Sequence, residues 1–379
     1  MPQKKTRDSS FELLRIVCAF LIIFSHWSDY SGFMFDIDDF GLSRLMTEFM
    51  RYGGKISCNC FVLISGYFLV SSKFSFSKAL RLWFETFFYS VSIYIFGVVF
   101  GMTEFSATAL IRHCLPLMTE QYWFIRAYFV LYLLVPPLNA MIRAMGSRVH
   151  KYAIVALFVP LCVVGTLVYL PFFENMNPWF SDELWFIELY LIAAYVKLYP
   201  SAFTESRKLH FALSAAITLF IWASFLIMDP ICAWYNPGRP EEEGLYAYFL
   251  SSQFTITGFL CAFFYFLAFK NMRLPSLPVI DYVATTVFGV YLIHTHPLLL
   301  KRMWQGVFST VKYFGTFWFV PASVGVCLAT FVICGVIDKI RYYLLERPLF
   351  RLLDPALQKL QEKVFPSEEK KENLLQIMH

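Results

Sequence analysis

An arginine and a histidine, Arg15 and His26, share the first apolar stretch of the chain, residues 11 to 27. Each residue of an α-helix turns by about 100°, so His26 lies about 20° past three full turns from Arg15 and about 16 Å along the axis. One helix face would thus carry a permanent cation near one leaflet and a titratable imidazole near the other. Charges inside membrane helices are costly and typically mark function. The structural alternative places Arg15 at the lipid headgroups and His26 beside Trp27 in an aromatic belt.

Three residues near the starts of later apolar stretches are candidates for substrate binding. Lys55 follows Gly53–Gly54, a pair that indicates close backbone approach or a broken helix start. Trp123 and Arg126 open the stretch at 122–142. Snorkelling is the alternative for both cations, and the aromatic belt is the alternative for Trp123 and the adjacent Tyr122.

Two more candidates lie deeper in the chain. Glu188 is the acid farthest inside an apolar stretch, so it needs a partner or a proton. An ion pair with Arg126 is the favoured interpretation, and orientation of His26 is the alternative. His294 and His296 are predicted at the depth of His26, with Pro297 ending or kinking their helix. Their i, i+2 spacing points the two rings apart, so we predict no metal site, and interfacial histidines are the alternative.

The elements that position these residues are membrane helices. The chain is 58% hydrophobic and 16% charged, with a mean hydropathy of +0.56, whereas soluble domains are near 45–50% apolar and 25% charged. We therefore predict an all-α fold, a polytopic membrane helical bundle. About ten stretches are long enough to span a bilayer: 11–28, 51–71, 82–101, 122–142, 152–172, 180–199, 209–228, 247–269, 279–300 and 318–338.

The loop cations predict the orientation of this bundle. With the N-terminus in the cytoplasm, 14 loop cations lie inside and 6 outside, as the positive-inside rule requires. Both termini are then cytoplasmic. We expect a cytoplasmic tail at 1–10, a transmembrane domain at 11–340 and a cytoplasmic tail of short helices at 341–379. Glu346, Arg347 and Pro348 would stop the last span in a salt-bridge cluster.

Five sequence blocks then resemble one known family. Arg15-x10-His26, GGKISCNCFVLISGYF, YWFIRAYFVLYLLVPPLN, FGVYLIHTHP and ERPLF occur in this order between about residue 9 and residue 351. Together they resemble the membrane acyltransferase-3 family, bacterial integral-membrane enzymes that O-acetylate surface polysaccharides, of the exopolysaccharide or capsule type. Family members often carry a second histidine where this chain has Ser25, which leaves His26 as the base candidate in this helix.

The resemblance implies a reaction and roles for the candidates. The donor substrate would be acyl-CoA, usually acetyl-CoA, with no permanently bound cofactor and no metal. Arg15 would bind a CoA phosphate or a carbonyl of the pantetheine arm. His26 would act as general base on an acceptor hydroxyl, with a covalent acyl-His26 intermediate as the rival mechanism. Lys55 or Arg126 would stabilise the oxyanion.

The implied partners and location follow from the same resemblance. The acceptor would be a polysaccharide or lipid-linked glycan, and the protein would be a multi-pass protein of the bacterial inner or plasma membrane. Membrane lipids are partners, nucleic acid is not, and a homodimer is left open. The competing class is a glycan or lipid transporter or flippase, but the two related halves typical of transporters are not visible in the sequence.

Overall fold

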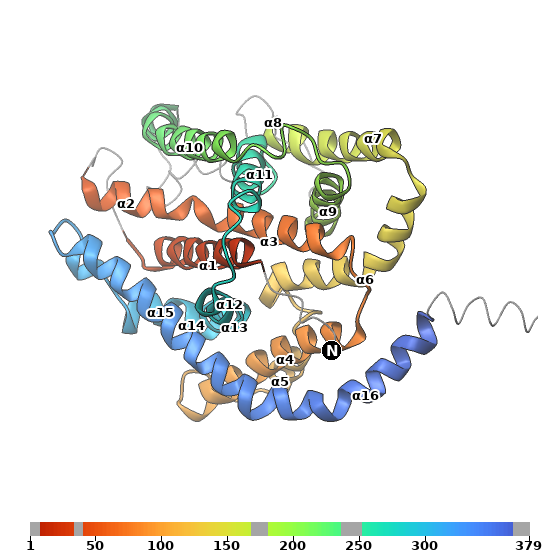
Figure 1. Cartoon of the computed structure of the whole chain (residues 1–379). Coiled ribbons are helices and arrows are strands. Elements are labelled where there is room, and N and C mark those ends of the chain that lie inside the picture. The colour runs from red at the N-terminus through yellow and green to blue at the C-terminus, as the bar shows by residue number, and fades with distance from the viewer. Residues whose placement is uncertain (1–7, 34–40, 168–180, 236–251, 367–379) are drawn as a thin grey trace, which may run out of the picture.

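The computed structural model describes residues 8–33, 41–167, 181–235 and 252–366. Within these ranges the chain consists of helices and their connections, without a strand (Figure 1). The predicted all-α membrane fold is therefore confirmed. This fold follows from the length of the apolar runs, which are too long for strands. In lipid, the backbone N–H and C=O groups of such a run can be satisfied by hydrogen bonds within a helix.

Within the described ranges, six helical segments are long and apolar enough to cross a membrane. Their bounds are α1 (Ser9–Tyr30), α4 (Phe76–Val99), α6 (Trp123–Ala144), the run Ser147–Leu167 that comprises α7 (Ser147–Phe158), a π-turn and α8 (Val164–Leu167), the part Arg207–Ile227 of α10 (Arg207–Tyr235), and a run starting with α15 (Phe319–Arg341). A seventh would be the bent pair Pro278–His294 and Pro297–Tyr313. The structure thus supports six or seven spans and does not confirm ten.

Three of the expected spans form shorter helices: α3 (Gly53–Leu69), α9 (Asp182–Leu198) and α11 (Ile256–Lys270). They have 17, 17 and 15 residues, against about 20 for a typical transmembrane helix. Their side chains form one core cluster with the N-terminal half of α1. A helix covered by other helices can be apolar all round without matching the bilayer thickness.

Helix α1 organises the bundle because it contributes to both cores. Phe11, Leu14 and Cys18 pack with α3, α9 and α11, whereas Ile23 and Trp27 pack with α13 (Val287–His294) and α15. In Figure 1, α1 and α3 lie side by side in the middle of the molecule. The polar residues of α1 are therefore held from two sides.

Glycines allow the close approach of α1 and α3. A Cβ on Gly53 would overlap the side chain of Leu21, and one on Gly54 would overlap Ser25, next to His26. The interpretation of this pair as a close backbone approach is confirmed. Small residues serve the same purpose in membrane bundles generally.

The expected kink near Pro297 is also present. Helix α13 ends at His294, and α14 (Pro297–Lys301) follows at a bend of 81° between the two helical segments. The ring of His296 caps α14, accepting a hydrogen bond from the Leu298 backbone N–H at 3.2 Å. Proline at the first helical position lacks only an N–H that would have no helical partner.

The end of the last span differs from expectation. Pro348 does not stop the helix, because α15 continues through a π-turn (Tyr342–Glu346) into α16 (Arg347–Val364). Pro348 lies in the first turn after the π-turn, where the missing N–H is tolerated. In the described part of the tail, which ends at residue 366, one 18-residue helix stands in place of the expected short helices. In Figure 1 it follows the edge of the bundle beside α4.

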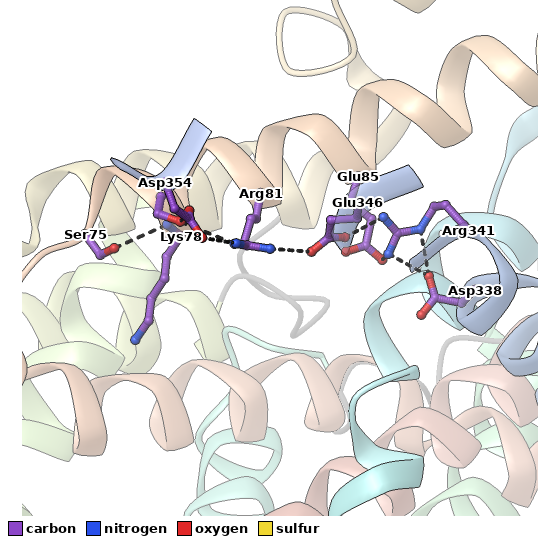
Figure 2. Close-up of polar contacts among 9 residues, drawn as sticks. Ser75, Lys78, Arg81, Glu85, Asp338, Arg341, Glu346 and Asp354 are labelled. Carbon is purple, nitrogen blue, oxygen red and sulfur yellow. Dashed lines mark hydrogen bonds and ion pairs between the residues drawn. The ribbon is translucent and has the colours of Figure 1, made fainter. Parts of the chain in front are cut away.

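A buried ionic network holds this C-terminal region and includes Glu346, as expected. Its central cation is Arg341, however, and not the expected Arg347, whose guanidinium lies 5.8 Å from the centroid of the Tyr343 ring. Figure 2 shows Arg341 among three carboxylates, at 2.6 Å from Glu346, 2.9 Å from Asp338 and 3.0 Å from Glu85. Only 3% of the Arg341 side chain is exposed. The network joins α4, α15 and the π-turn through one guanidinium, whose planar fork suits several carboxylates at once.

Candidate active site

A cavity of about 480 Å³ lies inside the bundle. Its walls come from α1, α3, α4, α6, α13 and the residues just before α13. Ligand pockets typically have 300–1,000 Å³ and mostly apolar walls with a few polar groups. Here the walls include Ile22, Phe61 and Phe288, and charged or titratable side chains mark the two ends.

Arg15 and Glu12 form one end of the cavity. The Arg15 Nη1 atom lies 2.6 Å from a Glu12 carboxylate oxygen, and the two side chains are 28% and 8% exposed. Residues three apart on a helix are neighbours on its surface. The pair keeps the cation at the cavity wall. Beside it, the Tyr128 hydroxyl donates a hydrogen bond of 3.1 Å to the Ser65 hydroxyl, and both side chains line the cavity.

Histidines from α1 and α13 meet at the other end. His26 Nδ1 lies 3.0 Å from His294 Nε2, and His294 lines the cavity while being only 1% exposed to solvent. His26 is partly exposed and reaches the cavity through this contact. Arg15 and His26 thus approach opposite ends of one cavity from one helix, as their spacing predicts.

Lys55 and Trp123 lie together outside the cavity lining. The Lys55 ammonium is 3.8 Å from the centroid of the Trp123 ring, a cation–π contact between α3 and α6. Both residues are at the first turn of their helices. Trp123 is therefore a partner for Lys55. Tyr122, which was expected beside Trp123 in the aromatic belt, is instead fully buried. The Tyr122 hydroxyl donates to the Leu292 carbonyl of α13 at 3.0 Å.

The expected ion pair between Glu188 and Arg126 is wrong. Arg126 pairs with Glu183 at 3.4 Å, whereas Glu188 is 0% exposed and its carboxylate has no hydrogen-bond partner among the described residues. It therefore does not orient His26 either. The reason is rotation along α9, since five residues turn the helix about 140° beyond one full turn. Glu183 faces α6, and Glu188 points into the core.

Several cavity residues give little signal in the sequence. Glu12 lies at the start of the first apolar stretch, and Ser65 beside Gly66 reads as helix packing. Gly66 does pack closely on α9, against Tyr190 and Ala193, while Ser65 faces the cavity. The described ranges contain no group of three His, Cys, Asp or Glu residues placed to hold a metal ion.

These features define an all-helical membrane protein with an internal cavity that has a cation at one end and an imidazole pair at the other. The family model Acyl_transf_3, described as an acyltransferase domain, matches residues 8–343. The chain belongs to this acyltransferase family, which confirms the resemblance carried by its five sequence blocks. The chain matches no curated protein and no solved structure.

Proposed function

We propose that this membrane acyltransferase moves an acyl group, in the simplest case acetyl, from cytoplasmic acyl-CoA to a hydroxyl of a surface or exported glycan. The observation that carries the proposal is the cavity with Arg15 at one end and the His26–His294 pair at the other. With Arg15 on the cytoplasmic side, as the loop charges predict, the cavity offers a path from the donor's compartment to the opposite leaflet.

The donor would enter at Arg15. A CoA phosphate or a pantetheine carbonyl would hydrogen-bond the guanidinium, and the pantetheine arm would lie along the apolar walls near Ile22 and Phe61. The thioester would then lie near His294 and His26. Glu12 keeps the guanidinium at the wall, so it is a positioning residue for the donor contact.

The chemical step would be direct transfer. His26 removes the proton of the acceptor hydroxyl as its oxygen attacks the thioester carbonyl. The tetrahedral intermediate then expels the CoA thiolate, which takes up the proton from the His26 imidazolium. In the rival mechanism, His26 first accepts the acyl group itself.

The acceptor would bind at the outer ends of α3 and α6. Lys55, Trp123 and Arg126 do not line the cavity, so we place them at the acceptor rather than along the pantetheine arm. An aromatic face flanked by cations and carboxylates can stack on a sugar ring and hydrogen-bond its hydroxyls. Any contribution of Lys55 to stabilising the oxyanion would come from the acceptor side of the thioester.

Substitution of Arg15 with alanine is expected to raise the KM for acyl-CoA by about 10-fold or more, because one charge-assisted hydrogen bond contributes about 1.5–3 kcal/mol. The effect on kcat should be smaller. Initial rates of label transfer from acetyl-CoA to polysaccharide in membrane vesicles measure both constants. Arg351→Ala, at an exposed position of α16, is the matched control. An unchanged KM would remove Arg15 from the donor site.

The function is tested by deleting the gene and measuring ester-linked acyl groups on the surface polysaccharide. We expect the ester to disappear and to return with the wild-type chain, while the amount of exported polysaccharide stays constant. Polysaccharide retained inside the deletion strain would contradict the proposal and favour the transporter. Membrane vesicles supplied with labelled acetyl-CoA should label the polysaccharide only when the protein is present.

A further inference from the structure

A chain of two hydrogen bonds links His26 to the backbone of α13. His294 Nδ1 lies 2.6 Å from the carbonyl oxygen of Val290, four residues earlier in the same helix. His294 Nε2 lies 3.0 Å from His26 Nδ1. The two imidazoles come from helices 268 residues apart in sequence.

The chemistry of the three groups fixes the direction of both bonds. A carbonyl oxygen only accepts hydrogen bonds, so His294 Nδ1 must carry the hydrogen that points to Val290. In a neutral imidazole the other nitrogen then has a lone pair, so His294 Nε2 accepts. His26 Nδ1 must therefore donate to it. This leaves His26 Nε2 as the unprotonated nitrogen.

We propose that His294 is a positioning residue that holds His26 in the tautomer with hydrogen on Nδ1, so that His26 Nε2 is the atom that removes the acceptor's proton. The inference rests on the proposed function. When Nε2 takes the proton, His26 becomes an imidazolium and its bond to His294 becomes charge-assisted, which stabilises the cation. The proton later passes from Nε2 to the leaving CoA sulfur, and His294 neither gains nor loses one.

The surroundings of His294 suit a residue with a fixed orientation. Its ring is 1% exposed, and Tyr122 anchors α13 two residues away through the Leu292 carbonyl. On another face of α13, a Cβ at Gly289 would overlap the Asp338 carboxylate of α15, so the two helices are in direct contact. Small errors in the position of a base cost large factors in rate, and these contacts limit such movement.

Two polar substitutions separate positioning from general structure. The side-chain amide of His294→Gln places a polar atom near the former Nε2 and can accept from His26 Nδ1. The amide of His294→Asn reaches only the former Nδ1 region and can still donate to Val290. We expect the Gln variant to keep kcat within about 10-fold of wild type. The Asn variant should lose about 100-fold or more in kcat, the lower range of a general base's contribution, with the KM for acyl-CoA nearly unchanged.

The experiment measures label transfer from acetyl-CoA in membrane vesicles that contain equal amounts of each variant. His150→Asn is the control, because His150 is also buried and bonded to a backbone carbonyl, that of Leu191 at 3.0 Å, and should keep wild-type rates. Equal rates for His294→Gln and His294→Asn, whether high or low, would overturn the positioning role. Absence of transfer by the wild-type protein would instead refute the proposed function, so the two failures are distinguishable.

Discussion

Replacement of His26 with alanine is expected to lower the rate of acyl transfer by about 100- to 10,000-fold, the range of a positioned general base. The imidazole of His26 contacts the end of the cavity opposite Arg15, through His294. His26→Gln should be equally slow, because an amide has no basic nitrogen. Rates of label transfer from acetyl-CoA, normalised to protein in the membrane, measure the effect.

His210→Ala provides the matched control for this substitution. His210 is buried in α10 and contacts Asn271 at 3.4 Å, so its removal disturbs the interior of the bundle without reaching the cavity. We expect its kcat to stay close to wild type. A His26→Ala variant that inserts normally and transfers acyl groups at the wild-type rate would refute the role of His26 in either mechanism.

The same variants decide between direct transfer and an acyl-His26 intermediate. Incubation with labelled acetyl-CoA in the absence of acceptor should leave the protein unlabelled if transfer is direct. In the covalent mechanism, label would accumulate on the wild-type protein and be absent from His26→Ala. Mass spectrometry of the peptide that contains residues 16–30 after rapid denaturation identifies such an adduct.

Replacement of Arg341 with leucine is expected to lower the free energy of unfolding by about 3–5 kcal/mol, the cost of breaking a buried charge pair. Glu85, Asp338 and Glu346 lie close together, and the substitution would remove the guanidinium that compensates their negative charges (Figure 2). Arg341→Lys should lose less, because an ammonium keeps the charge but not the planar fork. The thermal unfolding midpoint of the purified protein in detergent micelles measures these differences.

Arg351→Leu is the control for this prediction, since an exposed arginine on α16 should change stability by less than about 0.5 kcal/mol. Added salt should not mimic the loss, because a buried network is screened far less than surface charges. If Arg341→Leu unfolds at the wild-type midpoint, the network contributes no net stability. A loss of activity would accompany instability, because Asp338 also contacts α13 at Gly289, five residues before His294.

The sequence alone determined the features that depend on local geometry. Apolar run lengths predicted a helical membrane protein, and helix periodicity placed Arg15 and His26 on one face, because both follow from residues close together in the chain. The Gly53–Gly54 pair and Pro297 also behaved as predicted, since each restricts or frees the backbone at its own position. The five ordered blocks identified the family before any contact was known.

Only the tertiary structure decided which helix faces meet. The relative rotation of packed helices sets the contact between His26 and His294 and the pairing of Arg126 with Glu183. It also buries Glu188 without a hydrogen-bond partner among the described residues. The structure also decided how many apolar stretches have membrane length, because α3, α9 and α11 have 17, 17 and 15 residues and contribute to one core cluster with α1. Such contacts join residues far apart in sequence, and periodicity within one helix does not specify them.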